Sequence, residues 1–363
     1  MRVDSKAQTI QSAAMRALAC LALTVACSST PEQQPPEPPP ESEIALASPE
    51  PVGDVARFGR ASDYSAAHAG HVLLILRAGQ VVYEAGQNGH LPNEVHRLNN
   101  ASESFWGVLG VAADSDGLLD LDEPATFTLP EFKNDRLKRE IRIRHLLDYT
   151  SGLEPGVAVL QADRTPNLNK RALTLGTVSP PGADFQYGPS HLFAFAEILR
   201  RKLEPQGMDP LAYLKDRLLD PIGLRVAAWD RDQAGNPDVA FGASLTAREW
   251  AKLGRLLIDN GLWQGETIVA AEDLREAFTN RNSTPEFAFT MWRNTEDNGG
   301  ARKIRLRIFY PGSIPSLLVA AGVGNQRLYV IPSQDLVVVR FGAPDRGWQD
   351  RTFLQRLLAP DAS

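Results

Sequence analysis

Apolar positions along the chain predict strands near both ends of a folded body and helices between them. The segment HVLLILRAGQVVYEAG (71–86) predicts two strands joined by a tight turn at Ala78-Gly79. The segment QRLYVIPSQDLVVVRFG (326–342) predicts a second hairpin around Pro332-Ser333. Helical periodicity covers the remaining elements, at 102–113, 190–203, 209–219, 246–260, 271–278 and, as a closing amphipathic helix, 346–360. Terminal strands that share one sheet around a helical insertion form an α+β layered domain.

The first 27 residues have the layout of a secretory signal. Arg16 is followed by an apolar stretch of about ten residues, which is too short to remain in a membrane as a spanning helix. Met15 is a second candidate start, because the residues before it are polar. The stretch LTVAC resembles a bacterial lipobox, in which Cys27 becomes the lipidated first residue of the mature protein. Ordinary cleavage nearby, which leaves a free protein, is the alternative.

A segment rich in Pro, Glu and Ser follows and predicts an extended linker over residues 28–54. From residue 55 to 363 there is no second linker and no internal repeat, so this part predicts one domain. The signal and the linker together predict a periplasmic or cell-envelope protein, held at the membrane through a lipid anchor only.

Composition excludes several classes of partner and cofactor. The formal net charge of −6 and the pI near 5.6 argue against a nucleic-acid-binding surface. The only cysteines are Cys20 and Cys27, so the body has no thiolate ligand and no cysteine nucleophile. The six histidines form no H-x-H or H-x-x-x-H cluster. The sequence therefore predicts no metal site and no cofactor.

Six segments of the body, in this order, resemble the β-lactamase-related serine hydrolases. That family includes class C β-lactamases, penicillin-binding DD-peptidases, esterases and 6-aminohexanoate-oligomer hydrolases. The resemblance implies the β-lactamase/transpeptidase-like fold, a mostly antiparallel sheet flanked by helices with a helical subdomain and a cleft between them. The matching segments are GLLDLDEPATFTLPEF (117–132), IRIRHLLDYTSGL (141–153), PPGADFQYGPSH (180–191), DPIGL (220–224), GASLTAREWAKLGRLLIDNG (242–261) and YVIPSQDLVVVRFG (329–342).

The resemblance also implies a serine nucleophile and a lysine base in an S-x-x-K motif at the start of a buried helix. Residues three apart share a helix face, so a neutral lysine amine can take the serine proton. The motif falls here on NASESF, which places Asn100 at the nucleophile position and Glu103 at the lysine position. From the residues alone, Asn100 and Glu103 predict a capping box, with Asn100 as the N-cap.

The family's other two motifs predict further site residues. Tyr187 occupies the place of the tyrosine in the Y-x-N motif, and Pro189 the place of its asparagine. Ala321 and Gly322 stand where the family has a Lys- or His-headed triplet on a strand. We expect these residues and Ser104 to line the binding cleft. Ser190 and His191 are expected to cap and begin the following helix.

Two functional hypotheses follow. The first is a catalytically degenerate serine-hydrolase homologue whose cleft binds a peptidoglycan-like or other small amide or ester ligand, or a protein partner. The alternative is an active esterase or amidase that works through a rearranged site, for example with Glu103 as a general base on water.

Overall fold

A seven-stranded antiparallel sheet organises the domain in the computed structural model, which describes residues 52–160, 165–279, 286–294, 314 and 316–358. The predicted signal segment, Cys27 and nearly all of the predicted linker lie outside these residues. None of the described helices has the length and apolar composition needed to cross a membrane.

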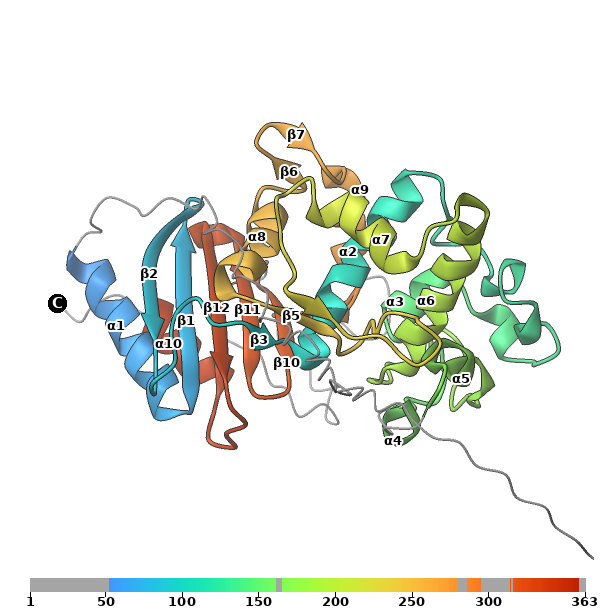
Figure 1. The fold of residues 1–363 in the computed structure, drawn as a ribbon, viewed down its shortest axis with the longest axis horizontal. Helices are drawn as coiled ribbons and strands as arrows, with labels where there is room; N and C mark the ends of the chain where they lie inside the picture. The colour runs from blue at the N-terminus through green and yellow to red at the C-terminus, as the bar shows by residue number, and fades with distance from the viewer. Residues whose placement is uncertain (1–51, 161–164, 280–285, 295–313, 315, 359–363) are drawn as a thin grey trace, which may run out of the picture. The chain divides into compact units, whose positions relative to one another are not determined.

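The strand order of the sheet is β2-β1-β12-β11-β10-β9-β8, so the first and last long strands are neighbours (Figure 1). Its strands are β1 (Gly70–Arg77), β2 (Gln80–Gly86), β8 (Phe287–Ala288), β9 (Met291–Arg293), β10 (Leu318–Gly322), β11 (Gln326–Ile331) and β12 (Leu336–Gly342). Val72 pairs with Phe341 and Arg77 with Leu336. Both predicted hairpins are confirmed, and the sheet is the one predicted.

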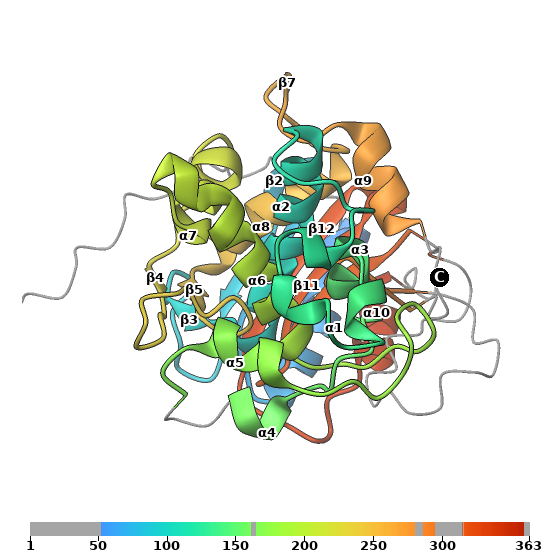
Figure 2. The ribbon, with the colours of Figure 1, turned by 90° about the vertical axis from the view of Figure 1, so that its right-hand side faces the viewer.

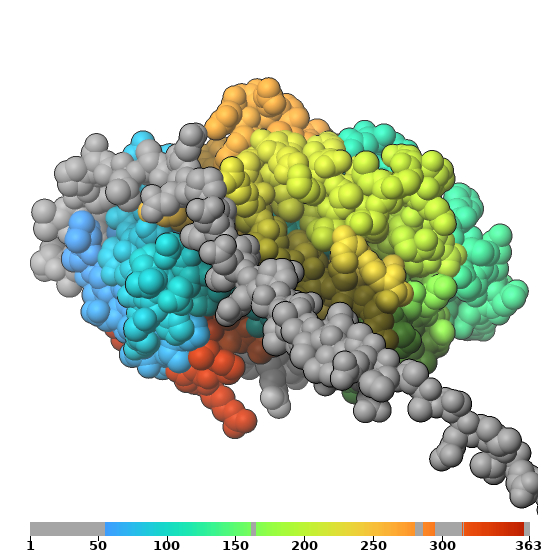
Figure 3. Space-filling model, viewed as in Figure 1, coloured from blue at the N-terminus to red at the C-terminus, as the bar shows by residue number. Residues whose placement is uncertain are grey.

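The remaining strands form two small sheets, one ordered β3-β5-β4 and one made of β6 and β7. They are β3 (His96–Arg97), β4 (Ala228–Trp229), β5 (Ala243–Leu245), β6 (Leu262–Trp263) and β7 (Glu266–Thr267). Figure 3 shows the part of the chain that contains β6 and β7 in orange at the upper edge of the molecule.

The α-helices lie on both faces of the main sheet and in a separate helical part (Figure 2). They are α1 (Val52–Ala67), α2 (Ser104–Ser115), α3 (Ile143–Leu147), α4 (Val157–Leu160), α5 (Leu168–Thr174), α6 (Ser190–Leu203), α7 (Pro210–Leu214), α8 (Ala247–Ile258), α9 (Ala271–Phe278) and α10 (Asp350–Leu358). Helices α1 and α10 pack on each other and on one face, whereas α8 packs on β11 and β12 at the opposite face. This arrangement confirms the predicted fold class.

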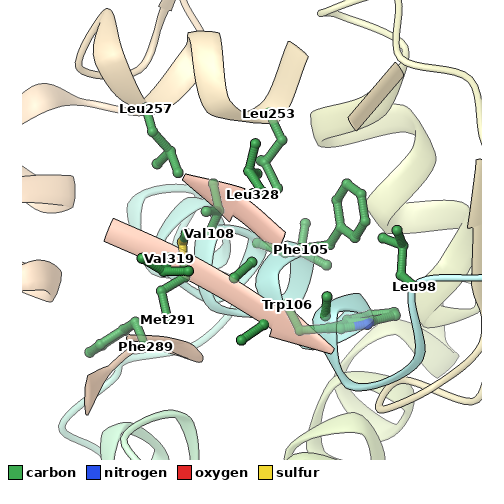
Figure 4. Packing of buried hydrophobic residues seen from close by; sticks show 14 of the residues in the cluster. Leu98, Phe105, Trp106, Val108, Leu253, Leu257, Phe289, Met291, Val319 and Leu328 are labelled. Atoms are coloured by element: carbon green, nitrogen blue, oxygen red, sulfur yellow. The ribbon is translucent and has the colours of Figure 1, made fainter. Parts of the chain in front are cut away.

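Helix α2 lies at the centre of the domain, and every residue from Ser104 to Ala113 is buried. Apolar side chains of α2, α8, β10 and β11 meet there, as Figure 4 shows for Val108, Leu253, Val319 and Leu328. A helix that is buried on all sides needs apolar or small residues on every face, and SFWGVLGVAADS provides them as far as Ala113.

A buried ion pair attaches α10 to the sheet. Arg327 Nε donates to Asp350 Oδ1 at 2.7 Å, Arg327 Nη2 donates to Oδ2 at 3.1 Å, and the Tyr329 hydroxyl donates to Oδ1 at 2.5 Å. All three side chains are buried. The Arg327 guanidinium and these hydrogen bonds outweigh burial and hold the pKa of Asp350 below its usual value.

We expect Asp350→Ala to lower the free energy of unfolding by about 3–5 kcal/mol, because it leaves the Arg327 charge buried and uncompensated. Urea unfolding measures this loss. The control is Glu272→Ala, which removes an exposed ion pair with Arg275 and should change stability by less than about 0.5 kcal/mol. Equal losses in the two variants would contradict this account of α10.

Candidate active site

The chain reaches α2 through a 3₁₀ turn, η1 (Asn99–Glu103), that continues directly into the α-helix. Asn99 has a positive φ of 52°, and its side-chain amide donates to the Val323 carbonyl at 3.1 Å. The residues that precede η1 and α2 are Leu98 and Glu103, and neither makes a side-chain capping bond. The predicted capping box is therefore wrong. Glu103 turns inward because η1 and α2 form one continuous helical segment.

Strand β10 lies against η1 at Gly322. A Cβ atom on this glycine would lie 2.1 Å from the Leu98 carbonyl oxygen and 3.1 Å from the Ala101 nitrogen. These are backbone atoms, so they cannot move aside as a flexible side chain would. Glycine at this position thus brings the strand's backbone onto the segment that carries Asn100.

The Glu103 side chain is 2% exposed and faces Tyr187 of the predicted tyrosine motif. The Tyr187 hydroxyl donates to Glu103 Oε2 at 3.0 Å. Burial raises the pKa of Glu103 to about 8, although the hydrogen bond from Tyr187 and the nearby polar groups of Tyr149 and Asn100 favour the charged form. The carboxyl is therefore protonated at neutral pH and is not an ionic base.

Tyr149 forms the inner wall of this site and is completely buried. Its ring lies 5.6 Å from the Tyr187 ring and stacks on His191 at 5.0 Å between centroids. Its hydroxyl affects the pKa of Glu103, yet within the described residues neither this hydroxyl nor Glu103 Oε1 has a partner of good hydrogen-bond geometry. Tyr149 is a site residue that the sequence prediction missed.

A second polar pair, Ser151 and His191, lies behind Tyr149. Ser151 Oγ is 2.7 Å from His191 Nδ1, and His191 Nε2 is 2.7 Å from the Gln186 carbonyl oxygen. The carbonyl requires a proton on Nε2, so the serine hydroxyl donates to Nδ1. Burial lowers the pKa of His191 to about 4, and both side chains are fully buried. Ser151 and His191 are as close as a serine nucleophile and its base would be, but neither is exposed to solvent. The bond from His191 to the Gln186 carbonyl holds the chain just before Tyr187.

The remaining predicted site residues separate into two groups. Asn100, Tyr187 and Gly322 are partly exposed. Ala321, next to Gly322, and Pro189, two residues after Tyr187, are buried. Ser104 is completely buried and its hydroxyl donates to the Ala101 carbonyl at 2.7 Å, so the expectation that Ser104 lines a cleft is wrong.

The start of α6 also differs from the prediction. The helix begins at Ser190 itself, Pro189 precedes it, and no side chain caps it. The Ser190 hydroxyl is buried without a hydrogen-bond partner among the described residues, so Ser190 is not the cap. His191 points instead to Ser151, 40 positions earlier in the chain.

Chemically, the Asn100 site offers neutral hydrogen-bonding groups. A carboxamide has no proton that a base could remove to make a useful nucleophile. The protonated Glu103 and the phenol of Tyr187, whose pKa burial raises well above its ordinary value, can donate and accept hydrogen bonds. Metal-ligating side chains come together elsewhere, where the structure brings His71, His90 and His96 into one cluster.

Comparison with known proteins gives consistent matches. The sequence profile of the Beta-lactamase family matches residues 55–352. The 6-aminohexanoate-dimer hydrolase of Paenarthrobacter ureafaciens is 26% identical in an alignment 306 positions long, which covers 76% of this chain and 72% of the relative.

Solved structures share the fold at low sequence identity. EstCE1, a hydrolase with promiscuous acyltransferase activity, superimposes with a TM-score of 0.66 at 17% identity, over 85% of this chain and 98% of EstCE1. A penicillin-binding protein homologue from Caulobacter crescentus gives a TM-score of 0.64 at 14% identity, over 86% and 97% of the two chains.

We expect the stability of the protein to fall between about pH 4.5 and 8 relative to Glu103→Gln. In this window the folded chain keeps the Glu103 proton and the unfolded chain has lost it, so each pH unit removes up to about 1.4 kcal/mol. Urea unfolding across the pH range measures the difference. The exposed Glu272→Gln variant is the control and should follow the parent. Parallel curves for the parent and Glu103→Gln would refute a buried neutral carboxyl.

We expect Gly322→Ala to destabilise the domain by about 1–3 kcal/mol, because the added methyl group overlaps the Leu98 carbonyl. Thermal unfolding measures the loss. Gly59→Ala in α1 is the matched control, since its Cβ atom would meet nothing within 4 Å and the helix gains a better helix former. A neutral Gly322→Ala variant would show that β10 and η1 tolerate wider spacing.

Proposed function

The chain belongs to the Beta-lactamase family, and from this premise we propose that it is a catalytically degenerate serine-hydrolase homologue. It binds a small amide or ester ligand at the partly exposed surface around Asn100, Tyr187 and Gly322 without cleaving it. The observation that carries this proposal is a buried carboxyl, that of Glu103, which accepts a hydrogen bond from Tyr187 at the position where the family has its lysine base.

The chemistry of the two motif positions supports loss of the family mechanism. Acyl transfer through S-x-x-K needs a hydroxyl nucleophile and a basic amine. Asn100 supplies no hydroxyl, and Glu103 holds its own proton at neutral pH. Neither residue can therefore start the reaction that the family's serine and lysine perform.

The surroundings of these positions support retained binding. Tyr187 contacts Glu103 directly, and β10 lies on the Asn100 segment. The groups at this surface are neutral donors and acceptors, which match an amide or ester better than a charged substrate. The 6-aminohexanoate-dimer hydrolase relative is named for a dimer of an amino acid, so a short linear amide, or a peptidoglycan fragment, is the ligand class that we propose.

An active enzyme with a rearranged site is the alternative, and one observation favours it. Glu103 has a pKa near 8 and accepts a hydrogen bond from Tyr187, so its carboxylate would form at alkaline pH and could activate a water molecule. That reaction would rise with pH through 8 and would need the Glu103 carboxyl.

The proposed location follows from the N-terminal sequence. We propose export to the cell envelope and attachment through a lipid on Cys27, with residues 28–54 as a spacer. A domain without cysteine in its body fits an exported protein.

We expect the purified protein to show no turnover of nitrophenyl esters or nitrocefin and no covalent labelling by a fluorescent penicillin. The double variant Asn100→Ser with Glu103→Lys should gain labelling, because it restores a nucleophile and an amine base on one helix face. Gel fluorescence measures labelling and absorbance measures turnover.

The single variant Asn100→Ser is the matched control and should remain unlabelled, since its hydroxyl has no base. Turnover by the parent that rises through pH 8 and disappears in Glu103→Gln or Tyr187→Phe would replace the proposal with the active alternative.

A further inference from the structure

Three of the six histidines meet outside the candidate active site. His71 lies on β1, His90 in the loop after β2, and His96 on β3, and a nitrogen atom from each ring lies within 4.8 Å of the other two. The rings of His71 and His90 stack with centroids 3.7 Å apart, and His96 lies 5.4 Å from His71. The three residues are 19 and 6 positions apart in sequence, so no local motif reveals them.

The backbone of this loop is built to bring His90 onto β1. Asn88 and Gly89 both have positive φ, so the chain reverses direction after β2. At Gly86 a Cβ atom would lie 2.0 Å from the His90 carbonyl oxygen, a contact that only glycine allows. The loop forms part of the cyan surface in Figure 3, where a dissolved ion could reach it.

Glu94 orients the His90 ring. Glu94 Oε2 lies 2.7 Å from His90 Nδ1, and Glu94 Oε1 accepts a hydrogen bond from the Leu91 nitrogen at 2.8 Å. A carboxylate at Nδ1 holds the proton there and leaves the lone pair of Nε2 free. This carboxylate–histidine arrangement is the one that accompanies metal-bound histidines.

His96 contributes a nitrogen that the described residues leave unsatisfied. Its Nε2 atom is buried without a hydrogen-bond partner among them, and it lies 3.9 Å from Glu94 Oε2. A ring nitrogen left in this way can coordinate a metal ion.

We propose that His71, His90 and His96 bind one divalent transition-metal ion of the kind that imidazole prefers, Zn²⁺ first, with Glu94 positioning His90. Three histidines leave a fourth position for water, as in other three-histidine zinc sites. An ion about 2 Å from each nitrogen needs these atoms closer together than the 4.8 Å limit of the cluster, so the rings would move inward on binding.

The site would have a structural effect on the candidate active site. Strand β3 is separated from η1 only by Leu98, and η1 carries Asn100. An ion that joins β1, the loop and β3 would therefore fix the segment from which the Asn100 turn starts. This inference does not depend on the proposed function.

The test uses the full chain with Cys20→Ser and Cys27→Ser, which removes the only thiols. Calorimetric titration with Zn²⁺ should give one ion per chain, and Co²⁺ should give the visible absorption of nitrogen coordination. His90→Gln and His96→Gln should each weaken binding at least a hundredfold. Glu94→Gln should weaken it about 10–100-fold, because it removes the group that orients His90.

His145→Gln is the matched control, since His145 is a partly buried histidine of helix α3 and not of the cluster, and its Zn²⁺ affinity should equal the parent's. The His90→Gln substitution should preserve the fold, because the His90 side chain is about one-third exposed. Absence of Zn²⁺ and Co²⁺ binding by the parent would overturn the proposal. Equal affinity of the parent and His90→Gln would overturn it as well.

Discussion

The burial of α2 on every side is the constraint from which the candidate active site follows. Gly107 and Gly110 let the helix approach its neighbours, because a Cβ atom at Gly107 would lie 2.0 Å from the Phe289 carbonyl oxygen and one at Gly110 would lie 2.5 Å from Leu147. A helix held this closely leaves little water at its first turn. A carboxyl group there, that of Glu103, must keep its proton and find hydrogen bonds within the protein.

Because the surroundings of Glu103 are dry, the chemical type of the side chain at this position decides its charge at neutral pH. An amine in the same place would be pushed toward its neutral form, which is the useful state for a base, whereas a carboxyl is pushed toward its protonated form, which is not. Burial would therefore make an amine at this position a better base, whereas it keeps a carboxyl protonated. The Tyr187 hydroxyl makes a stable contact with that neutral acid. The same fold can therefore hold a neutral, hydrogen-bonded carboxyl in a place where a buried amine would be a base.

The sequence predicted elements whose patterns are local. The two hairpins have alternating strands and short turns, and Ala78 and Gly79 have the positive φ angles that a two-residue turn needs. Helix α1 was missed, because its sequence VGDVARFGRASDYSAA contains several poor helix formers, namely Gly, Ser and Asp. The inward turn of Glu103 could not be predicted, because a capping box and a continuous 3₁₀–α segment share the same residues.

Contacts between distant residues were missed for a related reason. Tyr149 meets Glu103 and Tyr187 only after α2, α3 and α6 are packed, and no spacing rule joins these positions. The position of Tyr187 could be predicted because a family pattern marks it.

The pairing of β1 with β12 joins residues such as Val72 and Phe341, near the two ends of the described chain. The central sheet therefore cannot close until almost the whole domain has been synthesised. Closing the sheet is thus a long-range loop closure, and the export that we propose would pass the chain through a membrane pore before its last strand could complete the sheet.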